Sequence, residues 1–192
     1  MNPFKDYGEV KFDDDRYKLT LEKLPAQLSG QALDLGVVNP FTPFLKQTYP
    51  KLEIANTEED LDLDVAAFPY EDKKFDYVFS FEVLEHLMNP LWNLLECRRI
   101  LKDAGTIYLT TPKGIFPSTL MWPPAHFHEI DHKRMHILAE RAGLQIKRIE
   151  RFNKSPFYWW KMGLIRPTLR ILMGGWFYIE LQKAGVGQDG KS

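Results

Sequence analysis

This sequence has little cysteine, no marked excess of either charge and no long apolar runs. Cys97 is the only cysteine among 192 residues, which excludes an intramolecular disulfide and a zinc site built on several thiolates. The 25 Lys and Arg residues nearly balance the 26 Asp and Glu residues, so we expect no nucleic-acid partner. No stretch approaches the about 18 apolar residues of a membrane span, and the first residues lack the apolar run of a signal peptide. We therefore expect a cytoplasmic protein without a transmembrane segment.

The composition that is present is typical of one folded domain. Apolar residues make up 44% and charged residues 27% of the chain. We expect a single domain over residues 1–184, with an N-terminal extension over residues 1–14 and a flexible tail over residues 185–192. Residues 154–175 form an insertion rich in aromatic and basic residues. This insertion could form a peripheral membrane element or a lid that covers a hydrophobic substrate, whereas a helix packed on the sheet or a dimer interface is the more common outcome for such a segment.

Short apolar runs alternate with helical patterns along the chain. Strands are predicted over residues 32–36, 51–55, 77–81, 106–111, 144–152 and 176–181. Helices are predicted over residues 16–28, 41–48, 82–101 and 132–142, the last with Asp131 as its N-cap and Gly143 just past its end. This order predicts an α/β sheet with helices on both faces. Ligands of such sheets bind at the C-terminal ends of the strands.

The longest informative run, over residues 68–87, reads FPYEDKKFDYVFSFEVLEHL. It continues into RILKDAGTIYL at residues 99–109, and ALDLG stands earlier at residues 32–36. In order and spacing these motifs resemble those of the class I S-adenosylmethionine-dependent methyltransferases. AGL at residues 142–144 and WFYIELQK at residues 176–183 resemble the segments around the last two strands of that family. The resemblance implies a Rossmann-like, doubly wound sheet, mostly parallel with an antiparallel last strand, in one methyltransferase-like domain.

The same resemblance implies a reaction and a set of cofactor residues. The reaction is in-line transfer of a methyl group from S-adenosylmethionine to a small-molecule or lipid-like acceptor. Asp34 would orient the ammonium group of the cofactor, and Asp64 with the Val65 amide matches the pair that meets adenine. The full set of candidate cofactor residues is Asp34, Leu35, Gly36, Val37, Asn39, Asn56, Thr57, Asp64, Val65, Ser80 and Phe81.

Departures from the family pattern suggest an alternative to methyl transfer. Val38 and Pro40 stand where the first loop of the family usually has glycines, and Asn56-Thr57 replaces the acidic residue that holds the ribose. The span over residues 52–68 is also short for a helix and a further strand. The alternative is a non-catalytic binding or scaffold protein with this fold, in which Asp34 ties down the loop after its strand. A nicotinamide-dependent enzyme is disfavoured because the Gly-x-Gly-x-x-Gly turn is absent.

Residues 126–132, HFHEIDH, hold the densest group of titratable side chains. His126 and His128 are candidate general bases, and a structural loop is the alternative. Glu82 and His86, on one face of the predicted helix over residues 82–101, are candidates for the substrate cleft with Trp122 and Glu129. His126, His128 and His132 could also hold a metal, as could Asp60, Asp62 and Asp64 on a strand edge. A capped helix and a solvated strand face explain these two groups better, so no metal is expected.

Overall fold

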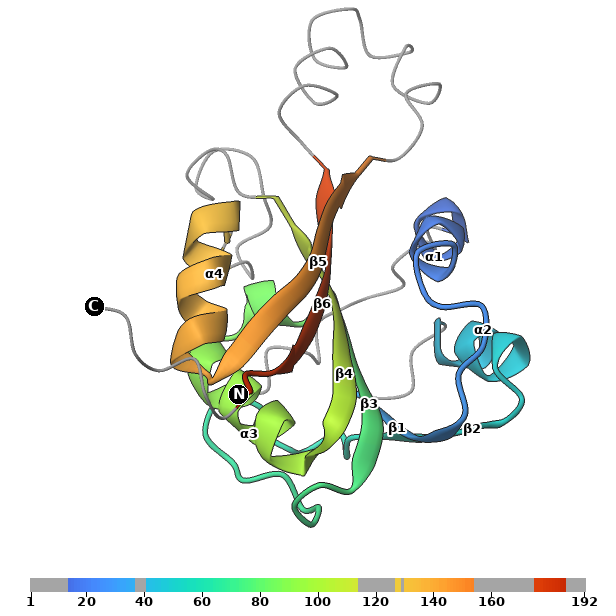
Figure 1. The fold of residues 1–192 in the computed structure, drawn as a ribbon, viewed down its shortest axis with the longest axis horizontal. Helices are drawn as coiled ribbons and strands as arrows, with labels where there is room; N and C mark the ends of the chain where they lie inside the picture. The colour runs from blue at the N-terminus through green and yellow to red at the C-terminus, as the bar shows by residue number, and fades with distance from the viewer. Residues whose placement is uncertain (1–13, 37–40, 114–126, 129, 154–174, 186–192) are drawn as a thin grey trace, which may run out of the picture.

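The computed structural model describes residues 14–36, 41–113, 127–128, 130–153 and 175–185. Almost all of the predicted extension, insertion and tail lies outside these residues. The described residues form one six-stranded sheet in the order β2-β1-β3-β4-β6-β5 (Figure 1). The strands are β1 (Gly30–Asp34), β2 (Leu52–Asn56), β3 (Phe75–Phe81), β4 (Leu101–Pro112), β5 (Leu144–Phe152) and β6 (Trp176–Lys183).

Four neighbouring strands, β2, β1, β3 and β4, run parallel, whereas β6 runs antiparallel to both β4 and β5. This arrangement confirms the predicted mostly parallel sheet with an antiparallel last strand. The central parallel strands are apolar on both faces because both faces are covered. In β1, for example, both Ala32 and Leu33 are fully buried.

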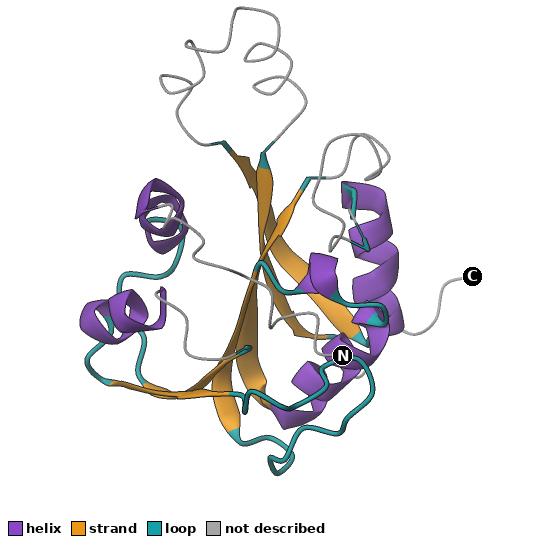
Figure 2. Ribbon diagram, turned by 180° about the vertical axis from the view of Figure 1, so that it is seen from behind, coloured by secondary structure: helices purple, strands orange, loops and turns teal. Residues whose placement is uncertain are grey.

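The helices cover the sheet from both sides, as predicted. Helices α1 (Asp14–Leu21) and α2 (Phe41–Thr48) lie on one face, and α3 (Pro90–Ile100) and α4 (His132–Arg141) lie on the other (Figures 1 and 2). Successive strand residues point to opposite faces, so Phe79 packs in the core beneath α2, and Val78 packs in the core beneath α3 and α4. No helix in the described part of the chain has the length and apolar character needed to cross a membrane.

The prediction of a single long helix over residues 82–101 is wrong. After β3 the chain forms a short 3-10 helix, η2 (Leu84–His86), and α3 begins only at Pro90. The side chain of Asn89 accepts a hydrogen bond from the Trp92 amide at 3.3 Å and caps α3, and proline suits the first helical position because it has no amide to satisfy. Glu82 and His86 therefore do not share one face of an α-helix.

Three smaller boundaries also differ from the prediction. The first helix ends at Leu21 rather than at residue 28, and the strand predicted to begin at residue 106 begins at Leu101, with a shift in the register of β4 against β3 near its start. The expected strand face with Asp60, Asp62 and Asp64 is a series of turns, in which the Asp62 carbonyl accepts from the amides of Val65 and Ala66. The predicted ends of α4 are confirmed: Asp131 Oδ1 accepts from the Arg134 amide at 2.8 Å, and Gly143 follows the helix with φ of 68°.

Replacing Gly30 by alanine is expected to lower the free energy of unfolding by about 2 kcal/mol. Gly30 begins β1 with φ of 109°, and a Cβ there would overlap the carboxylate of Asp76. That carboxylate accepts from the Gln31 amide at 2.9 Å and from Lys102 Nζ at 2.8 Å, so moving it would break both bonds. Urea denaturation measures the loss. Gly185→Ala is the control, because no atom lies within 4 Å of its added Cβ, and an equal effect in both variants would contradict the prediction.

Candidate functional site

Asp34 ends β1 with an almost fully buried carboxylate, 1% exposed. Its Oδ2 accepts hydrogen bonds from Thr42 Oγ1 at 2.7 Å and from Asn56 Nδ2 at 3.3 Å. Burial raises the pKa of Asp34 to about 6, although these two bonds and the charge of Lys46 oppose the rise. The end of β1 therefore carries a carboxylate that changes charge just below neutral pH.

The loop after β1 is fastened by the end of β2. The Gly36 amide donates to Thr57 Oγ1 at 2.8 Å, and Asn56 Nδ2 lies 3.5 Å from the carbonyls of both Asp34 and Gly36. Leu35 is buried, and its amide bonds to the carbonyl of Phe79 on β3. Asn56 and Thr57 thus contact the predicted loop, but as its internal supports. The Asp34 carboxylate bonds to the side chains of Thr42 and Asn56, and it is Asn56 that contacts the backbone of this loop.

Asp64 and Val65 lie on the segment that follows β2 and are held beside the start of α3. Asp64 Oδ1 accepts from the Asn89 amide at 2.7 Å, and the Asp64 amide donates to Asp62 Oδ1 at 2.9 Å. The Val65 side chain is 68% exposed, and its amide lies 3.4 Å from the Asp62 carbonyl. An exposed valine next to an anchored carboxylate is a surface that a flat ligand could contact.

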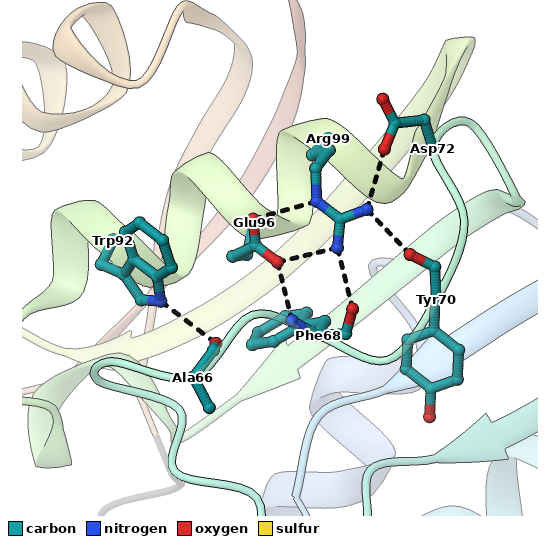
Figure 3. A network of polar contacts seen from close by, with 7 residues as sticks. All are labelled: Ala66, Phe68, Tyr70, Asp72, Trp92, Glu96 and Arg99. Atoms are coloured by element: carbon teal, nitrogen blue, oxygen red, sulfur yellow. Dashed lines mark hydrogen bonds and ion pairs between the residues drawn. The ribbon is translucent and has the colours of Figure 1, made fainter.

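Arg99 on α3 anchors the rest of this segment (Figure 3). Its guanidinium donates to the carbonyls of Phe68 and Tyr70 at 2.9 and 2.8 Å, and pairs with Asp72 and Glu96 at 2.8 Å each. Glu96 Oε2 also accepts from the Phe68 amide at 2.7 Å. No local pattern predicted this network, although Arg99 opens the motif over residues 99–109.

A second group of polar side chains lies where β3 ends. Ser80 is fully buried, and its Oγ has no hydrogen-bond partner in the structure. Phe81 contacts Phe41 edge-on, with ring centroids 5.2 Å apart. Glu82 Oε2 accepts from Arg16 Nη1 and from Trp176 Nε1, each at 3.0 Å. These partners lie 66 and 94 positions away along the chain, so no local sequence signal could have revealed them.

His128 lies beside η2 and is exposed. The amides of Phe127 and His128 both donate to the Glu85 carbonyl, at 2.8 and 3.2 Å. His128 Nε2 lies 3.3 Å from the Met88 carbonyl. A carbonyl only accepts, so Nε2 carries the proton in this contact, and Nδ1 is the basic nitrogen of the neutral ring.

The other candidates are placed only in part. His86 ends η2 and is half-buried. Five candidates lie outside the described residues: Val37, Asn39, Trp122, His126 and Glu129, and so do the two departures at Val38 and Pro40. Within the residues that the structure describes, no three His, Cys, Asp or Glu side chains are arranged to hold a metal ion.

Comparison with known proteins shows which proteins the chain resembles. Residues 28–109 match a family described as methyltransferase domain. The sequence is 26% identical over 127 residues to a probable S-adenosylmethionine-dependent methyltransferase of Mycolicibacterium smegmatis, covering 65% of this chain and 47% of that protein. It is 28% identical over 111 residues to the ubiquinone biosynthesis O-methyltransferase of Roseobacter denitrificans, covering 50% of this chain and 45% of that protein. The chain thus spans about half the length of these relatives.

The fold also resembles that of a solved structure. The structure of phosphoethanolamine N-methyltransferase 2 of Haemonchus contortus, in complex with S-adenosyl-L-methionine, superposes with a TM-score of 0.63 at 14% identity. The match covers 89% of this chain and 53% of that one. The family match extends from before β1 into β4, and therefore includes the ends of β1, β2 and β3 described above.

Proposed function

We propose that the chain is a class I S-adenosylmethionine-dependent methyltransferase, like the proteins that it resembles, that it binds this cofactor where β1, β2 and β3 end, and that it methylates a small-molecule or lipid-like acceptor. The observation that supports the proposal most is the direct bonding between separate candidate segments. Asn56 reaches Asp34 at 3.3 Å, and Thr57 holds the Gly36 amide at 2.8 Å. Residues from two strands thus build one rim at the edge where ligands of such sheets bind.

The residues on this rim fit the cofactor. Asp34 is an anionic partner for an ammonium group, and Asp64 is an acceptor for the exocyclic amine of adenine. Gly36 has φ of 98°, and no described atom lies within 4 Å of the place where a Cβ would stand. That open side of the backbone leaves room for a ligand to approach closely. Val37 and Asn39 complete the proposed set from the loop outside the described residues.

When bound, the cofactor supplies a methyl group on its sulfonium sulfur. The neutral thioether that remains after transfer is a good leaving group. The work of the protein is therefore chiefly to align the acceptor for in-line displacement. An oxygen or nitrogen acceptor must also lose a proton, for which His128 Nδ1 and His126 are candidate bases. Glu82, His86, Trp122 and Glu129 are the residues that we propose for the acceptor side of the cleft.

Isothermal titration calorimetry with S-adenosylmethionine and S-adenosylhomocysteine tests the proposal. We expect dissociation constants on the order of micromolar, as in the usual range for enzyme ligands. Absence of binding at millimolar ligand would contradict the proposal and favour the non-catalytic scaffold. In that case the inward bonds of Asn56 and Thr57 would have a purely structural role.

The same titration in Lys51→Ala provides a matched control. Lys51 precedes β2 and is exposed, at the opposite end of this strand from Asn56. Its replacement is expected to leave the dissociation constant unchanged, whereas Thr57→Val removes the hydroxyl that holds Gly36 and is expected to weaken binding about tenfold.

A further inference from the structure

Glu82 has an unusual backbone conformation at a position where the chain must change direction. It follows β3 directly with φ of 56°, in the left-handed region that a glutamate rarely adopts. Its amide donates to the Thr110 carbonyl on β4 at 3.0 Å, which fixes the peptide in place. Strained residues of this kind persist where the surroundings hold them, and they gather at functional sites.

The two carboxylate oxygens of Glu82 have unequal surroundings. Oε2 accepts from Arg16 on α1 and from Trp176 on β6, whereas Oε1 is buried and has no hydrogen-bond partner. The side chains of Glu82 and Arg16 are 19% and 23% exposed, so the pair lies at the margin of the core, with Oε1 on its buried side. An unpartnered buried acceptor requires an explanation, and a donor on a ligand is one.

A second buried carboxylate, that of Glu85, interacts electrostatically with Glu82. Glu85 is fully buried, its Oε1 also lacks a partner, and its Oε2 lies 3.4 Å from Thr111 Oγ1. Burial, reinforced by the charge of Glu82, raises the pKa of Glu85 well above its ordinary value. Glu85 is therefore the neutral member of the pair. Burial also raises the pKa of Glu82, but the charge of Arg16 and the side chains of Trp176 and Thr110 oppose that rise and favour its charged form.

Aromatic rings surround the Glu82–Arg16 pair. The Arg16 guanidinium lies 5.7 Å from the ring centroid of Tyr17 and 5.9 Å from that of Trp176. Tyr17 stacks on Phe41, which in turn contacts Phe81, at centroid distances of 4.7 and 5.2 Å. Tyr17, Phe81 and Trp176 are only half-buried. The end of β3 thus combines one carboxylate oxygen that can accept with ring faces that an apolar ligand can contact.

From this geometry we infer that Glu82 binds the methyl acceptor, and that the acceptor carries its reactive atom as an O–H or N–H group on an apolar body. This inference rests on the proposed methyltransferase function. Oε1 accepts a hydrogen bond from the reactive atom, and the ring faces of Tyr17, Phe81 and Trp176 contact the apolar body. As the bond from the reactive atom to the methyl carbon forms and the bond from carbon to sulfur breaks, the proton passes to Oε1. Protonated Glu82 then returns it to water.

The test uses pairs of probes that differ only in the donor. Phenols, aryl alcohols and primary aryl amines are compared with their fully O- or N-methylated counterparts, in the presence of S-adenosylhomocysteine, by saturation-transfer difference NMR. We expect the wild type to bind at least one donor about tenfold more tightly than its methylated counterpart. The hydroxyl and amine arms then identify the class of acceptor. If no donor is preferred, the inference is wrong.

Glu82→Gln is expected to abolish this preference and to lower the rate of methyl transfer to the preferred probe about 100-fold. Asp103→Asn is the control, because Asp103 is also paired, with Lys73 and Lys183, but lies near the start of β4, at the other end of this strand from Thr110. Arg16→Lys keeps both the carboxylate and a positive charge beside it and is expected to keep the donor preference, which makes the test independent of the folding of Glu82→Gln. Loss of the preference in Arg16→Lys would assign it to the guanidinium and overturn the inference.

His128→Ala separates the two candidate bases. A 100-fold loss of the transfer rate in His128→Ala with none in Glu82→Gln would contradict the inference. Calorimetry with S-adenosylmethionine distinguishes its failure from failure of the proposed function. Absence of cofactor binding by the wild type refutes the function itself, whereas retained binding without donor preference refutes only the role of Glu82.

Discussion

Replacing Arg99 by alanine is expected to lower the free energy of unfolding by about 2 kcal/mol. The guanidinium makes bonds to the carbonyls of Phe68 and Tyr70 and to the carboxylates of Asp72 and Glu96 (Figure 3). The Glu96 side chain is only 9% exposed, so without Arg99 it keeps a charge with one remaining donor, the Phe68 amide. Arg99 itself is 29% exposed, which places the expected loss below that of a fully buried pair.

The same variant is expected to bind S-adenosylmethionine about tenfold more weakly. Arg99 holds the segment over residues 68–72, which continues from the proposed adenine residues Asp64 and Val65. Urea denaturation and calorimetry measure the two effects. Arg98→Ala is the matched control, because Arg98 is the neighbouring arginine and its Nε donates to the carbonyl of Gly143, far from this segment. Equal losses in both variants would show that the network has no particular role.

Replacing Asp34 by asparagine is expected to stabilise the protein and to weaken cofactor binding at the same time. Burial raises the pKa of Asp34 from 3.8 to about 6, which corresponds to a cost of about 3 kcal/mol for the charged form at neutral pH. Asparagine carries no charge and can still accept from Thr42, so we expect a gain of about 1 to 3 kcal/mol at pH 7. Loss of a charged partner for the ammonium group is expected to weaken binding about 10- to 100-fold.

The pH dependence gives this prediction a definite sign. Because the folded protein binds a proton at Asp34 more tightly than the unfolded chain does, this residue makes stability fall as the pH rises from about 4 to about 6, with no further change above. Cofactor affinity should change in the opposite sense and decrease below pH 6. Both dependences should disappear in Asp34→Asn.

Asp76→Asn is the control for the expected direction of the stability change in Asp34→Asn. Despite the effect of burial, the bonds from Gln31 and Lys102 hold the pKa of Asp76 below its ordinary value. Its replacement should therefore destabilise the protein at neutral pH. If Asp34→Asn also destabilises, the charged form of Asp34 is supported by its surroundings more strongly than its burial indicates, and the prediction is wrong.

The sheet could be predicted from the sequence because its signals are local. Apolar runs such as ALDL and YVFSF specify buried strands, and the intervening helical patterns specify the crossovers that make neighbouring strands parallel. The ends of α4 followed from Asp131 and Gly143 for the same reason. The break before α3 was also visible in Asn89 and Pro90, but the apolar pattern across residues 82–101 concealed it.

The candidate site could be predicted only in part because its contacts are not local. The motifs placed Asp34, Gly36, Asn56 and Thr57 near one another, and the structure joins them by hydrogen bonds. The pattern did not indicate that Asn56 turns inward, that Glu82 takes a left-handed conformation, or that Arg16 and Trp176 meet at its carboxylate. Such pairings depend on how helices and strands distant in the chain pack together.

The place of β6 between β4 and β5 has a consequence for synthesis on the ribosome. β4 and β5 do not pair with each other, since each pairs only with β6 on that side of the sheet. Residues 176–183 are made after every other strand that the structure describes, so β5 can join the sheet only once this stretch has emerged. A premature stop before residue 176 would therefore leave two unpaired strand edges open to association with other nascent chains.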